Sequence, residues 1–131
     1  MYTLRMVISD SQLSDGVLSA LLESLITIDV EYLHRRMVGS DPVPPLFMSG
    51  VRYAVDNRWL DVGACRKQGK ADCKSLVAWR VAELRLAGEH ASPRVIRQRE
   101  RKDGRAMWHV LVRRGNGTLE DPSRILGMTV G

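Results

Sequence analysis

The sequence has little of several residue types, and each shortage excludes a class of protein. Only two of the 131 residues are cysteine, too few for the disulfide framework of a small secreted protein. Three Trp, three Tyr and one Phe are present, and they do not alternate with basic residues as a nucleic-acid stacking surface requires. No apolar run is long enough to span a membrane, and no signal-peptide core precedes Asp10. We therefore expect a protein of the cytosol or of a larger particle.

The two cysteines are expected to be free thiols. Seven residues separate Cys65 from Cys73, and a disulfide between them would consume the thiol that the downstream motifs single out. The Cys-x7-Cys spacing is not a usual zinc-ligand spacing, and His90 and His109 are not arranged as a second ligand pair. The sequence therefore predicts neither a metal site nor an organic cofactor.

Length and composition indicate a single domain that covers residues 1–131. Apolar residues make up 44% of the chain and charged residues 27%, which is ordinary for a globular protein. The formal net charge is +5, and basic residues gather in 66–74 and 94–105. Such runs most often form a solvated face, and no readout motif accompanies them. An acidic partner stays open, and nucleic-acid binding is the weakest interpretation of this charge.

The first 45 residues are expected to form an N-terminal region that is largely helical. Residues 2–8 alternate weakly between apolar and polar and fit an edge strand or an ordered arm. Ser14 or Asp15 can cap a helix whose apolar residues recur every three or four positions up to Leu25. This spacing predicts one apolar stripe along the helix.

A second short helix and a proline-rich connector are expected next. Asp29 fits the cap of a helix that ends at Gly39. Residues 41–45 contain three prolines and predict an extended connector, because proline lacks the backbone donor. Alternating apolar residues within 46–55 allow a short strand, and residues 66–71 are typical of a polar loop.

The clearest pattern begins at Asp72 and defines a core region, residues 46–131. Asp72 is a good N-cap, and the apolar residues that follow cover much of a helix circumference up to Gly88, which predicts a buried central helix. Asp-Gly and Asn-Gly pairs, which suit tight turns, then separate three predicted strands. The strands are 93–99, 107–113 and 118–121. The expected fold class is therefore α+β, with the central helix packed on a small antiparallel sheet.

Cys73 follows the predicted cap directly, at a place that favours a reactive thiol. Unpaired N–H groups and the dipole of the first helical turn stabilise a thiolate. Lys70 and Lys74 place positive charge nearby and are expected to act in the same direction. The same N–H groups could stabilise an oxyanion that forms on an attacked carbonyl group.

His109 and Asp121 can complete a nucleophile, base and acid set with Cys73. His109 lies within a predicted strand, and Asp121 lies at the end of the next one. A carboxylate that accepts one ring N–H of histidine fixes the tautomer of the imidazole. Strand alternation points Glu120 to the opposite face, so we expect Asp121 rather than Glu120 to serve.

Each residue of this set also has a purely structural interpretation. A cysteine in an apolar helix is usually a small buried residue, and a strand histidine usually makes a structural hydrogen bond. Asp-Pro after a strand is a common turn opener. Trp59 and Trp79 are expected to be core residues. The catalytic interpretation therefore depends on the order and spacing of all three residues.

The segment 70–128 resembles the transglutaminase-like branch of the papain-like cysteine enzymes. The matching motifs are Ala-Asp-Cys-Lys-Ser-Leu at 71–76, Trp-His-Val-Leu-Val at 108–112 and Glu-Asp-Pro-Ser at 120–123. Residues 46–53, after two prolines, are similar to small members of the group encoded by tailed phages. Close relatives tend to have Gly before Asp-Cys and acidic residues after it, whereas here an alanine precedes and a lysine follows.

The resemblance implies a role for each matching residue. Cys73 corresponds to the nucleophile, His109 to the base and Asp121 to the orienting acid. Gln68 and Trp59 are similar to the oxyanion donors of the papain and transglutaminase branches, although neither lies at a diagnostic spacing. We place Asp72 with them as a residue of the oxyanion or substrate region.

These observations predict a cysteine-dependent acyl-transfer enzyme, most simply a peptidase or amidohydrolase that acts on a protein or peptide amide. The alternative is a phage virion or assembly protein that keeps the fold without turnover and binds other phage structural proteins. The expected location is then the cytoplasm of a bacterial host or the virion. No membrane association is expected.

Overall fold

The structure, a computed structural model, has an α+β architecture and describes residues 14–100 and 106–129. Within these residues four α-helices and one short 3-10 helix alternate with five strands. The elements are α1 (Asp15–Arg36), η2 (Leu46–Met48), β1 (Arg52–Tyr53), α2 (Val62–Gln68), β2 (Lys70–Ala71), α3 (Cys73–Leu86), β3 (Ser92–Glu100), β4 (Ala106–Arg113), β5 (Leu119–Glu120) and α4 (Pro122–Ile125). The predicted fold class is confirmed at this level.

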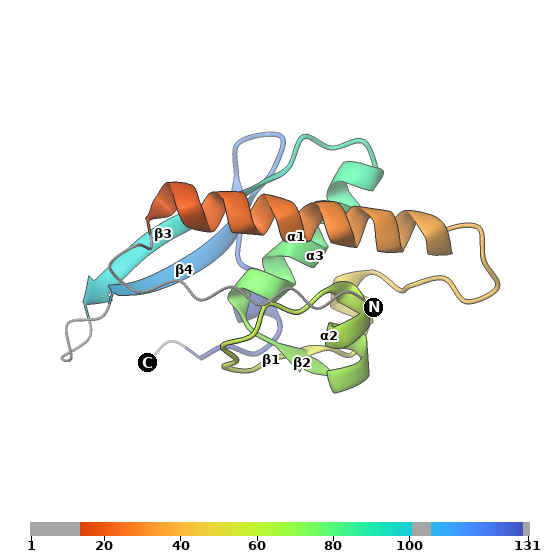
Figure 1. Cartoon of the computed structure of the whole chain (residues 1–131), viewed down its shortest axis with the longest axis horizontal. Coiled ribbons are helices and arrows are strands. Elements are labelled where there is room, and N and C mark those ends of the chain that lie inside the picture. Colours follow the sequence, from red (N-terminus) through yellow and green to blue (C-terminus); the bar gives the residue numbers. More distant parts are fainter. Residues whose placement is uncertain (1–13, 101–105, 130–131) are drawn as a thin grey trace.

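Helix α3 lies at the centre and the other elements pack around it. The long helix α1 lies across α3 and against β3, and α3 also contacts β4 and α4 (Figure 1). Strands β3, β4 and β5 form an antiparallel meander in that order, and β1 pairs in parallel with β2. The meander confirms the predicted order of three C-terminal strands.

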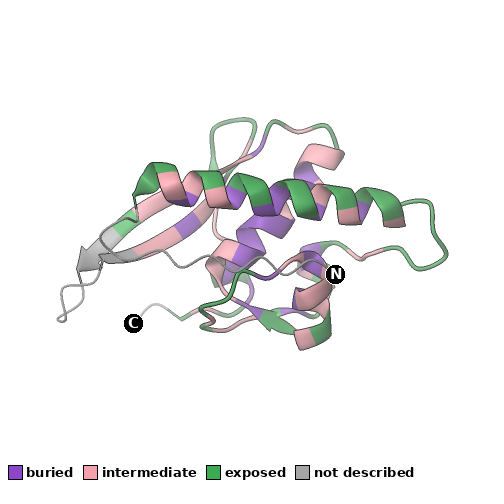
Figure 2. Cartoon of the chain, viewed as in Figure 1, coloured by how far each residue is buried: buried purple, intermediate pink, exposed green. Residues whose placement is uncertain are grey.

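The core is built mainly on α3, as its apolar circumference predicts. Figure 2 shows α3 as the most continuously buried helix of the chain. Its residues from Ser75 to Ala82 are all buried except Arg80, and the Trp79 side chain is completely enclosed. Burying side chains of this size supplies most of the stabilisation of a domain this small. Trp79 is thus a core residue, as expected.

The N-terminal region contains one long helix where two were expected. Ser14 caps α1, accepting the N–H of Val17 at 3.2 Å, and the helix continues without a break to Arg36. Asp29 therefore does not begin a new helix. Its buried carboxylate accepts the N–H of Val62, the first residue of α2, at 3.0 Å. Asp29 is thus a capping residue for a helix that lies next to it in space rather than in sequence.

A short helix and strand replace the polar loop that was expected at 66–71. The Asp61 side chain caps α2 by accepting the N–H of Ala64 at 2.8 Å, and Gly69 ends the helix at φ +78. A left-handed conformation of this kind is accessible to glycine at little cost. Strand β2 follows at once and leads directly into α3. The prediction failed because a helix of seven residues is too short to show periodicity.

The C-terminal segments agree closely with the prediction, and the main difference is at the end. β5 is only two residues long, and Asp121 leaves the sheet to cap α4, a single helical turn that begins with Pro122. Proline suits the first position of a helix because its missing N–H would be unpaired there. The expected arm at 2–8 and the expected turn at 102–105 lie outside the described residues.

Asp29→Asn is expected to flatten the pH dependence of stability. Burial raises the pKa of Asp29 well above 3.8. At pH values between 3.8, the pKa in the unfolded chain, and the raised pKa in the folded chain, Asp29 holds a proton only when the chain is folded. The free energy of unfolding therefore falls as pH rises through this window. Asparagine keeps the acceptor for Val62 without titrating. The stability of the variant relative to the wild type should grow by up to about 1.4 kcal/mol per pH unit within this window.

Urea unfolding between pH 4 and pH 8 measures this difference. Asp29→Ala is the matched variant, since it also removes the titration but leaves the Val62 N–H without a partner. It should lose about 1–3 kcal/mol relative to Asp29→Asn at every pH. Parallel stability curves for Asp29→Asn and the wild type would show that the carboxyl group does not hold a proton in the fold.

Candidate functional site

Cys73 is the first residue of α3, directly after β2 and the cap position at Asp72. Its side chain is partly buried and packs against the hydrophobic core, and the backbone N–H groups of Val110 and Lys74 lower the pKa of its thiol. The Lys74 N–H belongs to the first turn of α3, where no carbonyl group within the helix is available to it. The helix start therefore presents donors to the sulfur, as the sequence predicts.

The short length of β5 leaves part of the edge of β4 unpaired. β5 pairs with β4 only at Val112 and Arg113, so β5 does not cover the edge of β4 beside Val110. The Val110 N–H lowers the pKa of the Cys73 thiol, which places the thiol near this part of the edge. Because His109 immediately precedes Val110, the thiol lies near the part of β4 that carries His109.

His109 and Asp121 form the pair that the sequence predicts. The Nε2 atom of His109 lies 2.9 Å from Oδ2 of Asp121, and the two side chains are 12% and 20% exposed. A carboxylate can only accept, so Nε2 carries the proton of this bond and Nδ1 is left to exchange a proton with another group. Asp121 is held in turn by α4, whose Arg124 N–H approaches its other oxygen at 3.4 Å.

Glu120 points away from the histidine, as strand alternation requires. Its carboxylate binds Arg80 at 2.7 Å and Arg114 at 2.9 Å. Arg80 also binds Glu83 at 2.9 Å, so these side chains form a partly buried ion network between α3 and the end of β4. Glu120 therefore has a structural role, and the adjacent Asp121 is the carboxylate that binds His109.

The expected low pKa of the Cys73 thiol is wrong for this structure. Burial raises the pKa of Cys73, and the negative charge of Asp72 adds to the effect. The Val110 N–H, the Lys74 charge and the Lys74 N–H oppose this rise in pKa but do not outweigh it. The predicted helix-start effect is thus present, although desolvation is larger. At neutral pH the thiol is protonated and needs a base.

Asp72 is placed as predicted but does not cap α3 through its side chain. One carboxylate oxygen pairs with Lys74, and the other is buried without a hydrogen-bond partner among the described residues. Lys74 also donates to the backbone carbonyl of Asp56 at 2.8 Å. The positive charge beside Cys73 is therefore already paired, and burial raises the pKa of Asp72.

The Gln68 amide is engaged in other hydrogen bonds, and the Trp59 ring is partly exposed. The amide nitrogen of Gln68 donates to the Asp56 carboxylate and to the carbonyl of Lys70, each at 3.0 Å, so both of its N–H groups are used. Trp59 is 37% exposed, with the Lys74 ammonium 5.6 Å from its ring centre. The expectation that Trp59 is a core residue is therefore wrong, and its ring forms part of the surface near the start of α3.

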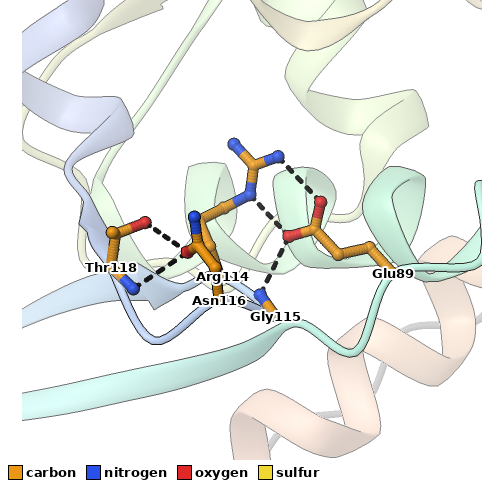
Figure 3. A pocket seen from close by; sticks show the side chains of 5 residues that line it. All are labelled: Glu89, Arg114, Gly115, Asn116 and Thr118. Atoms are coloured by element: carbon orange, nitrogen blue, oxygen red, sulfur yellow. Dashed lines mark hydrogen bonds and ion pairs between the residues drawn. The ribbon is translucent and has the colours of Figure 1, made fainter.

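A separate polar pocket lies where the chain leaves α3. It has a volume of about 280 Å³, and its lining includes Glu89, Arg114 and Asn116 (Figure 3). Arg114 holds the Glu89 carboxylate through two hydrogen bonds of 2.6 and 2.7 Å. The Asn116 side chain accepts from Thr118 within its own turn. The polar groups of these residues are hydrogen-bonded to one another, which indicates that they hold together the loop after α3 and the loop after β4.

Other site types find no support in the described ranges 14–100 and 106–129. Both cysteines are free thiols. No group of three or more metal-binding side chains occurs there. No helix in that part of the chain is long and apolar enough to cross a membrane.

One site feature had no signal in the sequence. Tyr53 lies on β1, and its pKa responds to the charges of Cys73 and Asp121, so it belongs to the same region of the molecule. Strands β1 and β2 are each two residues long, which is too short to show a hydrophobic period in the sequence.

Comparison with models of protein families, with curated proteins and with solved structures finds no match to this chain.

Proposed function

We propose that the protein is a cysteine-dependent acyl-transfer enzyme of the transglutaminase-like, papain-like type. The proposal is carried by one observation, the 2.9 Å pair of His109 and Asp121, in which His109 immediately precedes Val110, whose N–H lowers the pKa of the Cys73 thiol. A nucleophile, a base and an acid that orients the base are the minimum set for attack on an amide.

The raised pKa of Cys73 determines how the first step proceeds. The thiol is neutral at rest, so the Nδ1 atom of His109 accepts its proton as the sulfur attacks the carbonyl carbon. The resulting imidazolium is stabilised by Asp121 through Nε2. It then returns the proton to the leaving amine, the C–N bond breaks, and a thioester with Cys73 remains. His109 next removes a proton from water as the water oxygen adds to the thioester carbonyl carbon. The C–S bond then breaks, the acid leaves, and His109 returns the proton to the Cys73 sulfur.

The substrate class we propose is a protein or peptide amide, and the outcome is hydrolysis. The same thioester could pass to an amine and give cross-linking, but that reaction needs a dedicated acceptor site. The charged side chains beside the nucleophile, Asp72 and Lys74, pair with each other and would contact the substrate near the reacting bond.

A second candidate is a phage particle or assembly protein that retains the fold without turnover. The burial that raises the pKa of Cys73 favours this alternative, because a protonated and covered thiol is a poor nucleophile. The two candidates differ in one measurable property, whether Cys73 forms an acyl intermediate.

Reaction with p-nitrophenyl acetate tests the proposed function. We expect a burst of p-nitrophenol close to one equivalent, together with acetylation of Cys73 in the intact-protein mass spectrum. Cys73→Ala should abolish both. Cys65→Ala is the matched control, because Cys65 is completely buried in α2 and its pKa is raised by burial. Absence of a burst in folded wild-type protein, or a burst that survives Cys73→Ala, would favour the structural candidate.

A further inference from the structure

Strand β1 lies between the two segments that carry the nucleophile and the acid. Tyr53 pairs in parallel register with Ala71, two residues before Cys73. The N–H of Tyr53 donates to the carbonyl of Leu126, which ends the helix capped by Asp121, at 3.0 Å. The backbone of Tyr53 is therefore fixed on both sides, to the residues that lead into α3 and to those that follow β5.

The side chain of Tyr53 is held but its hydroxyl group is not used. The ring packs against the hydrophobic core together with Cys73, and the residue is half-buried. Its hydroxyl group makes no hydrogen bond within the described part of the chain. Burial raises the pKa of Tyr53, and the charges of Cys73, Asp72 and Asp121 raise it further. The hydroxyl group thus stays protonated and lies within the electrostatic reach of the candidate site.

Attack on an amide also needs hydrogen-bond donors for the carbonyl oxygen. The N–H groups at the start of α3 can supply one, and a side-chain donor adds to it. As the sulfur adds to the carbonyl carbon, the electron pair of the C=O bond moves to oxygen, and this charge needs hydrogen-bond donors. Gln68 cannot serve, because both of its amide N–H groups are engaged elsewhere. A phenol that is neutral, fixed through its backbone and without a partner is suited to this position.

We propose that Tyr53 is a catalytic residue whose O–H donates a hydrogen bond to the carbonyl oxygen of the acyl group attacked by Cys73. The inference rests on the proposed function and adds an oxyanion donor to it. The donor acts through a hydrogen bond alone, so Tyr53 keeps its proton throughout the reaction. The bond becomes stronger as negative charge develops on the oxygen.

Two reactions of Cys73 separate this role from the nucleophile itself. Acylation by p-nitrophenyl acetate passes through an oxyanion, whereas alkylation by iodoacetamide displaces iodide at a saturated carbon and forms none. Tyr53→Phe should therefore slow acylation by about 10²- to 10³-fold and leave the alkylation rate of Cys73 unchanged. Tyr32→Phe is the matched control. Its hydroxyl group, which accepts a hydrogen bond from Arg66 at 3.3 Å, lies between α1 and α2, and both rates should stay at wild-type values.

Three outcomes would overturn the inference. Equal acylation rates for Tyr53→Phe and the wild type would show that the hydroxyl group does not contact the reacting oxygen. Faster alkylation of Tyr53→Phe would show that the hydroxyl group binds the sulfur instead. Alkylation of wild-type Cys73 that is no faster than in His109→Ala would remove the proposed function, and the role of Tyr53 with it.

Discussion

Replacing His109 with alanine is expected to slow the acylation of Cys73 at pH 7 by roughly 10²- to 10⁴-fold. Burial keeps the thiol protonated at this pH, so attack requires a base, and His109 is the imidazole on the part of β4 that faces the sulfur. The burst rate with p-nitrophenyl acetate measures the effect. Because alanine leaves a gap beside Asp121, added imidazole should restore part of the rate.

His90 provides the control for this prediction. It is an exposed histidine in the loop between α3 and β3, outside the candidate site. His90→Ala should keep the wild-type burst rate. A His109→Ala variant that is folded and reacts as fast as His90→Ala would contradict a base at this position.

Asp121→Asn is expected to slow the same burst by roughly 10²-fold or more. The carboxylate accepts the Nε2 proton of His109 at 2.9 Å and thereby leaves Nδ1 unprotonated toward the thiol. An amide can present its own N–H to Nε2, which stabilises the opposite tautomer and removes the base. Asparagine remains a good helix cap, so α4 should keep its start. Burst kinetics together with the thermal midpoint separate the two effects.

Glu120→Gln is the matched control for the loss of a carboxylate in this segment. It makes the same chemical change one residue earlier, where the side chain binds Arg80 and Arg114 rather than His109. We expect it to lower stability while the burst rate stays within a few-fold of the wild type. Equal losses of rate in the two variants would mean that Asp121 acts only by holding the chain end in place.

The parts of the fold with a long hydrophobic period were predictable from sequence. The apolar circumference after Asp72 identified α3 as a buried helix, and the predicted Asn-Gly turn separates β4 from β5. Gly117, at φ +87, shows why this turn needs glycine. Local capping and turn chemistry decide such elements, so the sequence carries the information within a few residues.

The elements that depend on non-local contacts were not predictable. Asp29 has the residue type of a cap, but its partner is the N–H of Val62, 33 positions away. Strands β1 and β2, each two residues long, exist because they pair with each other, and β1 also bonds to the end of α4 through Tyr53. The pairing that carries Tyr53 to the candidate site therefore leaves no mark in the sequence.

The candidate site was predictable as a set of residues and less so in its electrostatics. The contact of His109 with Asp121 follows from strand order, and the place of Cys73 follows from the cap at Asp72. The direction of the Cys73 pKa shift does not, because desolvation depends on how closely β4 and the neighbouring segments enclose the sulfur. Helix-start donors were expected to decide the shift, and burial decides it instead.

The pH dependence of Cys73 alkylation by iodoacetamide tests the central claim most directly. In His109→Ala the rate should rise only as pH approaches the raised pKa of the thiol, above the ordinary range for cysteine. In the wild type, His109 accepts the proton, so the rate at pH 7 should exceed that of the variant by at least roughly tenfold. The gap should close at high pH, where both thiols ionise. Superimposable profiles for the two proteins would contradict the assignment of Cys73 and His109 as nucleophile and base.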